Sequence, residues 1–208
     1  MRLSAPLAAA FLLLIPQQAI QAQSNHRASP VKWRLVAEAL GTAGGTWLQG
    51  PRSPTVSSKV GFVFALGAER AVTDHVAVGA SARVGVQPLS IRENGSSWSG
   101  GTLTESAVLA TMSFRPRARA SVRLSFDVSG GAAALSSASR ILPFEDAARV
   151  APLAEVGVAL QRGSADASRR NIALLFRYSA LRFNVSSVNA FATSGWVGRV
   201  MAGVRVTR

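Results

Sequence analysis

Hydrophobic and polar residues alternate with a period of two along most of the chain, and no helix-period stripe of useful length follows residue 23. In the clearest segment, residues 118–128, the charged residues Arg119, Arg123 and Asp127 share one side, and the other side is apolar. A helix would scatter these charges around its axis, whereas a strand places them on one face. Eight such segments are predicted as strands: residues 33–41, 60–68, 76–86, 103–114, 118–128, 151–161, 171–183 and 196–206.

The connections between these segments alternate between long and short. Long links are predicted at residues 42–58, 88–101, 130–149 and 184–195, and shorter ones at residues 70–74, 115–117 and 163–168. Transmembrane barrels have this pattern, because one end carries short periplasmic turns and the other carries long extracellular loops. The sequence therefore predicts an all-β fold, an eight-stranded antiparallel up-and-down transmembrane β-barrel in the bacterial outer membrane.

The two faces of the predicted strands differ in composition. The apolar face carries no charge in any segment, while the other face is dominated by Gly, Ala and Ser with isolated charged residues. Small residues suit the narrow interior of an eight-stranded barrel, so the apolar face is predicted to meet lipid. The charged residues predicted to face the lumen are Arg34, Glu38, Lys59, Glu69, Arg83, Glu105, Arg119, Arg123, Asp127, Glu155, Arg177, Arg199 and Arg205.

Charges of both signs in a narrow lumen are expected to form ion pairs, because an unpaired buried charge is strongly destabilising. Arg123 and Asp127 lie about 13 Å apart along one strand. Arg123 is therefore expected to pair with Glu105 or Glu155 on a neighbouring strand. The favoured interpretation is a lumen filled by side chains. The alternative is a narrow anion-leaning pore, because arginines outnumber carboxylates among these residues.

The amino terminus has the order of a secretory signal. Arg2 precedes an unbroken apolar run at residues 7–15, and the small residue Ala22 stands just before the expected cleavage site. The run is shorter than the roughly 20 residues that a spanning helix needs. We expect residues 1–22 to be a signal peptide and residues 23–208 to form one outer-membrane β-barrel domain.

Composition and motifs argue against several classes of function. The formal net charge is +13, but the arginines are scattered and an exported chain rarely meets nucleic acid, so no nucleic-acid partner is predicted. There is no Cys, and the two histidines, His26 and His75, are far apart, so neither a metal nor another cofactor is predicted. The sequence contains no nucleophile elbow or phosphate loop, and no catalytic residues are predicted.

One stretch carries a family resemblance. Residues 67–79, Gly-Ala-Glu-Arg-Ala-Val-Thr-Asp-His-Val-Ala-Val-Gly, resemble the strand-turn-strand of small outer-membrane barrels of the opacity, OmpX-like and OmpA-barrel type. In that family a strand ends in Gly-x-Glu, a Thr/Ser-Asp turn follows and an alternating strand begins. The resemblance implies the same architecture for the mature chain and the barrel-assembly machinery as a partner. Such barrels usually end in an aromatic residue, whereas this chain ends in Arg208. Family members include adhesins, serum-resistance factors and membrane-tethering barrels.

A filled lumen would leave function to the loops, in a structural or adhesion role. The loop residues predicted to be exposed for interaction are Trp47, Arg52, Arg92, Trp98, Arg140 and Phe144. They would suit an extracellular partner of unknown identity or the phosphates of lipopolysaccharide, beside the membrane lipid itself. A second alternative is a soluble lipocalin-like carrier, because Gly45-Thr46-Trp47 matches the Gly-x-Trp of that family, whose apolar face points inward to a ligand.

Overall fold

The computed structural model describes residues 33–50, 53–116, 122–137, 150–162, 171–184 and 194–208, so the predicted signal peptide lies outside the described residues. No helix in these ranges is long and apolar enough to cross a membrane. The described strands are β1 (Trp33–Thr42), β2 (Thr46–Gly50), β3 (Ser53–Ser58), β4 (Gly61–Ala71), β5 (Val76–Glu93), β6 (Ser96–Phe114), β7 (Val122–Ser137), β8 (Val150–Arg162), β9 (Asn171–Asn184) and β10 (Ser194–Thr207).

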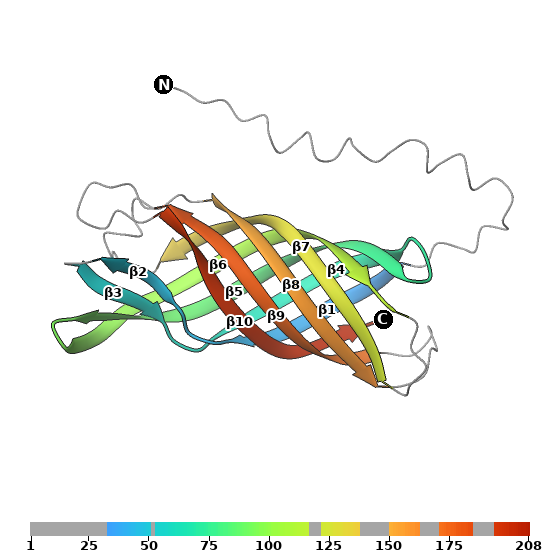
Figure 1. Ribbon diagram of the computed structural model, residues 1–208, viewed down its shortest axis with the longest axis horizontal. Coiled ribbons are helices and arrows are strands. Elements are labelled where there is room, and N and C mark those ends of the chain that lie inside the picture. Colours follow the sequence, from blue (N-terminus) through green and yellow to red (C-terminus); the bar gives the residue numbers. More distant parts are fainter. Residues whose placement is uncertain (1–32, 51–52, 117–121, 138–149, 163–170, 185–193) are drawn as a thin grey trace, which may run out of the picture. The chain divides into compact units, whose positions relative to one another are not determined.

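Eight of these strands close into a barrel (Figure 1). Their order around the ring is β1, β4, β5, β6, β7, β8, β9 and β10, and every neighbouring pair is antiparallel. The first and last strands complete the ring, where Leu35 and Arg208 exchange backbone hydrogen bonds of 2.8 and 2.9 Å. Closure pairs the backbone groups that hydrocarbon would leave unsatisfied. The predicted eight-stranded antiparallel up-and-down barrel is confirmed.

Side chains of the barrel strands alternate between the lumen and the outside. On β4, Phe62, Phe64 and Leu66 are between 62% and 70% exposed. Their neighbours Val63 and Ala65 are at most 4% exposed. The same alternation runs along the other barrel strands, and the apolar face that the sequence assigned to lipid is the outer face.

Glycines on the inner face allow neighbouring strands to approach closely. A Cβ atom added at Gly203 would lie 2.0 Å from the backbone oxygen of Ala39, and one added at Gly131 would lie 2.0 Å from that of Val108. No side chain fits at such distances, so these two positions require glycine. This explains part of the small-residue bias that the sequence shows on the lumen face.

The predicted loop at residues 88–101 is wrong, because these residues extend two strands. β5 continues to Glu93 and β6 starts at Ser96, and the two are joined through Asn94 and Gly95, whose φ angles are 47° and 82°. Asn-Gly is a preferred pair for a two-residue hairpin turn, because both positions need positive φ. A tight hairpin therefore projects from the barrel where a loop was expected.

The predicted loop at residues 42–58 is also largely strand. It contains β2 and β3. β3 pairs with β5 from Thr55↔Arg92 to Ser58↔Leu89, in the part of β5 that continues past its pairing with β4. Together β2, β3 and the outer parts of β5 and β6 form a four-stranded extension, the loop-end sheet, at the left of Figure 1. The opposite end of the barrel, where β4 turns into β5 and β6 ends, is the turn end.

Candidate functional site

Charged side chains fill the middle of the lumen. Four guanidinium groups and four carboxylates, each at most 8% exposed, reach inward from seven of the barrel strands. This set, the lumen network, consists of Glu38 on β1, Arg83 on β5, Glu105 on β6, Asp127 on β7, Glu155 on β8, Arg177 on β9, and Arg199 and Arg205 on β10.

One half of the lumen network centres on Glu38. Arg205 donates from Nε to Glu38 Oε1 at 2.8 Å and also forms an ion pair with Asp127. Arg177 donates from Nη2 to Glu38 Oε1 at 3.1 Å, while its Nη1 lies 2.9 Å from Glu38 Oε2. The Glu38 carboxylate is therefore shared by two guanidinium groups, one on each of β9 and β10.

The other half centres on Glu105 and Glu155. Arg83 donates from Nε to Glu105 Oε1 at 3.0 Å and forms a further ion pair with Glu155. Arg199 Nη1 lies 2.6 Å from Glu105 Oε2. Arg177 Nη1 lies 3.2 Å from Glu155 Oε2, which joins the two halves into one unbroken chain of alternating positive and negative groups.

The lumen network is balanced in charge and spans the lumen. Its four positive and four negative formal charges cancel. The Arg83–Glu155 pair links β5 to β8 and so crosses the lumen. A cavity beside the network, lined by Glu38, Arg177 and Arg205 among others, has a volume of about 30 Å³, which is space for water-sized molecules only.

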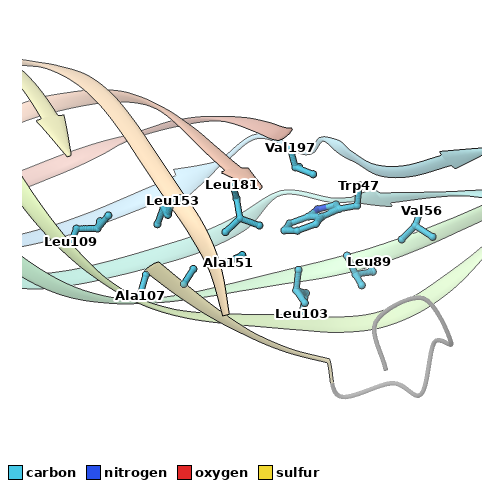
Figure 2. Packing of buried hydrophobic residues seen from close by; sticks show 11 residues of the cluster. Trp47, Val56, Leu89, Leu103, Ala107, Leu109, Ala151, Leu153, Leu181 and Val197 are labelled. Atoms are coloured by element: carbon cyan, nitrogen blue, oxygen red, sulfur yellow. The ribbon is translucent and has the colours of Figure 1, made fainter. Parts of the chain in front are cut away.

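An apolar cluster packs inside the barrel on the side of the loop-end sheet. Trp47 is 5% exposed and packs in one cluster with Leu89, Leu103 and Val197 (Figure 2). The guanidinium carbon of Arg199 lies 5.7 Å from the centre of the Trp47 ring, within the range of a cation–π contact. The lumen network and the apolar cluster are therefore in direct contact.

This placement corrects two predictions. Trp47 was expected on an exposed loop, but it lies on β2 and is buried in the apolar cluster. Lys59 was expected in the lumen, but it is exposed. The Trp47 error comes from the segment 42–58 that was read as one loop, whereas Lys59 lies between β3 and β4, outside the barrel strands.

The charged residues nearest the turn end differ from the lumen network. Arg34 and Arg123 are half-buried, and no carboxylate in the described ranges lies within ion-pair distance of either. The prediction that Arg123 pairs with Glu105 or Glu155 is wrong, because arginines of the lumen network occupy both carboxylates. Glu69 pairs with Arg115, a residue that the sequence analysis assigned to a turn. Arg119 lies outside the described residues.

Two of the remaining loop candidates are found on the loop-end sheet. Arg92 is exposed on β5, and Trp98 is 44% exposed on β6. Arg52, Arg140 and Phe144 lie outside the described residues.

The outer face of the barrel is apolar. Large hydrophobic side chains that are more than half exposed include Leu35, Phe64, Leu66, Val108, Ile172, Phe176 and Val200. Soluble monomers rarely expose such a continuous apolar surface, whereas a closed barrel with this surface matches a lipid bilayer. A soluble lipocalin-like carrier does not fit, because its apolar face would point inward and its lumen would not be filled by charged side chains.

Comparison with known proteins agrees with this assignment. No protein-family model and no curated protein sequence matches the chain. Among solved structures, the chain is similar to the outer membrane protein OprG from Pseudomonas aeruginosa, with a TM-score of 0.54 and 6% identity over 85% of this chain and 95% of that one. Neisserial surface protein A (NspA) gives a TM-score of 0.49 and 13% identity over 86% and 99% of the two chains.

The likeness to OprG shows the fold, which is that of a small outer-membrane β-barrel. Strands that close a barrel with an apolar outer face and a polar lumen are the form in which β-proteins cross the outer membrane. Fold and surface together assign this barrel to the bacterial outer membrane.

Proposed function

We propose that this protein is a non-enzymatic outer-membrane barrel with a non-conducting lumen, and that it acts as a structural or adhesion protein through the surface beyond the membrane. The observation that carries the proposal is the double closure of the lumen. The lumen network fills the middle, and the cluster around Trp47 covers it on the side of the loop-end sheet. A barrel closed in this way leaves interaction as the role of its exposed end.

The loop-end sheet supplies a rigid surface for such an interaction. Arg92 and Trp98 are both exposed on the hairpin of β5 and β6. Arg92 opposes Ser97 and Ile91 opposes Trp98, so the two side chains lie on opposite faces of the hairpin and each face presents one of them. Tryptophan and arginine are the residue types that contribute most to binding at protein interfaces. The guanidinium also suits phosphate groups, so lipopolysaccharide and an extracellular protein are the partner classes of this surface. Insertion would depend on the barrel-assembly machinery.

The alternative of an anion-leaning pore depended on the surplus of arginine. Within the lumen network the formal charges cancel, so the middle of the lumen offers an anion no net attraction. Desolvated ion pairs also resist opening, because a broken pair leaves buried charges without partners. These observations favour the closed barrel over the pore.

Conductance in planar bilayers tests the proposal. We expect the purified full-length protein to show no steady current. A Trp47→Ala/Arg83→Ala/Glu155→Ala variant should conduct, because it removes the indole and the ion pair that crosses the lumen while keeping the charge balanced. This variant also shows that the assay detects an opened barrel.

The matched control is Trp98→Ala/Arg92→Ala/Glu93→Ala, which changes the same residue types on the exposed hairpin. It should stay as silent as the wild-type protein. A steady wild-type current would contradict the closed-lumen proposal.

A further inference from the structure

A cavity of about 270 Å³ occupies the turn end of the lumen. Its lining includes the charged residues Arg34, Glu69, Asp74, Arg115, Arg123 and Arg205. It therefore lies on the opposite side of the lumen network from the cluster around Trp47. Nothing in the proposed surface role uses this cavity.

Two arginines enter this cavity from opposite walls. Arg34 lies on β1, between β4 and β10, and Arg123 lies on β7, between β6 and β8. In the eight-stranded ring, β1 and β7 are four strands apart in either direction. Both side chains line the same cavity and both are half-buried. An ion held between them would meet a guanidinium group on each side.

Among the described residues, no carboxylate forms an ion pair with either of these two arginines. Of the carboxylates in the lining, Glu69 pairs with Arg115, and Asp74 is exposed on the turn between β4 and β5. Arg205 also lines the cavity, but its guanidinium is taken up by Glu38 and Asp127. Among the described lumen residues, the arginines without a carboxylate partner thus lie at the turn end, while the lumen network is neutral.

The lining also offers uncharged hydrogen-bond donors. Gln161 and Asn171 contribute side-chain amides, and Thr207 contributes a hydroxyl group. Guanidinium groups bind oxyanions through paired N–H donors, and low-dielectric walls strengthen the attraction. Two positive charges without an ion-pair partner among the described residues match a dianion, and a tetrahedral phosphate presents oxygens toward both walls.

From this geometry we infer that the cavity is a binding site for a small anion that carries a phosphate group, held between Arg34 and Arg123. Short turns of outer-membrane barrels face the periplasm, so the site opens to periplasmic solutes. The phosphate group can belong to a free phosphate ester or to the head group of a lipid in the adjacent leaflet. The site requires the barrel, but it is independent of the surface role and of whether the lumen conducts.

Isothermal titration of the purified full-length barrel in detergent micelles tests this site. The probes are inorganic phosphate and glycerol 3-phosphate, each added at constant ionic strength. We expect saturable binding by the wild-type protein. Arg34→Gln and Arg123→Gln should each weaken it about tenfold, because each removes a charge-assisted interaction with the phosphate. The double variant should show no measurable binding.

The matched control is Arg182→Gln, the same chemical change at an exposed position near the loop end of β9, which should bind as the wild-type protein does. Circular dichroism, and the difference in gel mobility between heated and unheated samples, verify that each variant is folded. Where a Gln variant fails to fold, Arg34→Lys or Arg123→Lys replaces it. Lysine keeps the charge but loses the paired donors of arginine, so these variants are also expected to bind phosphate more weakly than the wild-type protein.

The two sources of phosphate give different results. Binding of glycerol 3-phosphate in micelles supports a soluble ester, whereas binding of a short-chain phosphatidylglycerol with no response to glycerol 3-phosphate supports a lipid head group. Absence of saturable binding with all three probes would overturn the inference, as would binding that both Arg→Gln variants leave unchanged. The measurement is of binding heat rather than current, so its failure is distinct from failure of the closed-lumen proposal.

Discussion

Replacing Glu38 with glutamine is expected to lower the free energy of unfolding of the barrel by about 3–5 kcal/mol. Glu38 is shared by Arg177 and Arg205, and all three side chains are at most 8% exposed. Glutamine keeps the shape but not the charge, so two buried guanidinium groups lose a common counter-charge. Urea unfolding in micelles, followed by tryptophan fluorescence, measures the change.

The control for this variant is Glu93→Gln, the same chemical change at an exposed position next to the Asn94-Gly95 turn. Its effect should stay within about 0.5 kcal/mol, because exposed substitutions outside special sites rarely exceed that. Equal urea midpoints for Glu38→Gln and Glu93→Gln would show that the lumen around Glu38 is wet enough to solvate free guanidinium groups.

The expected loss is large because the lumen network connects strands that are distant in the chain. Arg205 and Asp127 are 78 residues apart, and Arg177 and Glu38 are 139 residues apart. These contacts form only when the ring is closed. The lumen network therefore stabilises the closed barrel as a whole, beyond the pairing of adjacent strands.

Strand positions and facing could be predicted from the sequence because they depend on a local rule. Side chains alternate along a strand, so uncharged positions such as Phe62, Phe64 and Leu66 had to share one face. The lumen position of Arg83 and Glu105 followed from the same rule. Strand number and alternating connections then sufficed for the barrel.

The partners inside the lumen could not be predicted, because they depend on how the strands are staggered around the ring. Arg83 reaches Glu155 from β5 to β8, three strands away, which alternation on either strand does not reveal. The assignment of Glu155 to Arg123 assumed that pairs form between adjacent strands, and this assumption is why it was wrong.

The loop-end sheet was missed for a different reason. Gly, Pro and Ser in residues 42–58 and 88–101 were read as loop, although Asn94-Gly95 is a strong hairpin signal between alternating residues. With that hairpin recognised, β6 would have been extended to include Trp98. The burial of Trp47 depends on pairing between β2 and β3 and between β3 and β5, which residues 42–58 alone do not specify.

Replacing Leu66 with arginine should destabilise the barrel in lipid vesicles by about 2–4 kcal/mol. Leu66 is 70% exposed on the outer face and lies at the centre of β4, between Ala37 and Ala82 on the neighbouring strands. A guanidinium group there would have to enter the hydrocarbon or distort the bilayer around it. Reversible urea unfolding in vesicles measures the cost.

Depth in the bilayer, rather than the added charge itself, is the cause of this cost, and Val72→Arg separates the two. Val72 is 55% exposed at the turn end, immediately after β4, where water and head groups can solvate the guanidinium. Near an interface the cost of arginine falls to about 0–1 kcal/mol. Equal costs at Leu66 and Val72, or folding of Leu66→Arg in vesicles with wild-type stability, would mean that the outer face of β4 does not meet the hydrocarbon core.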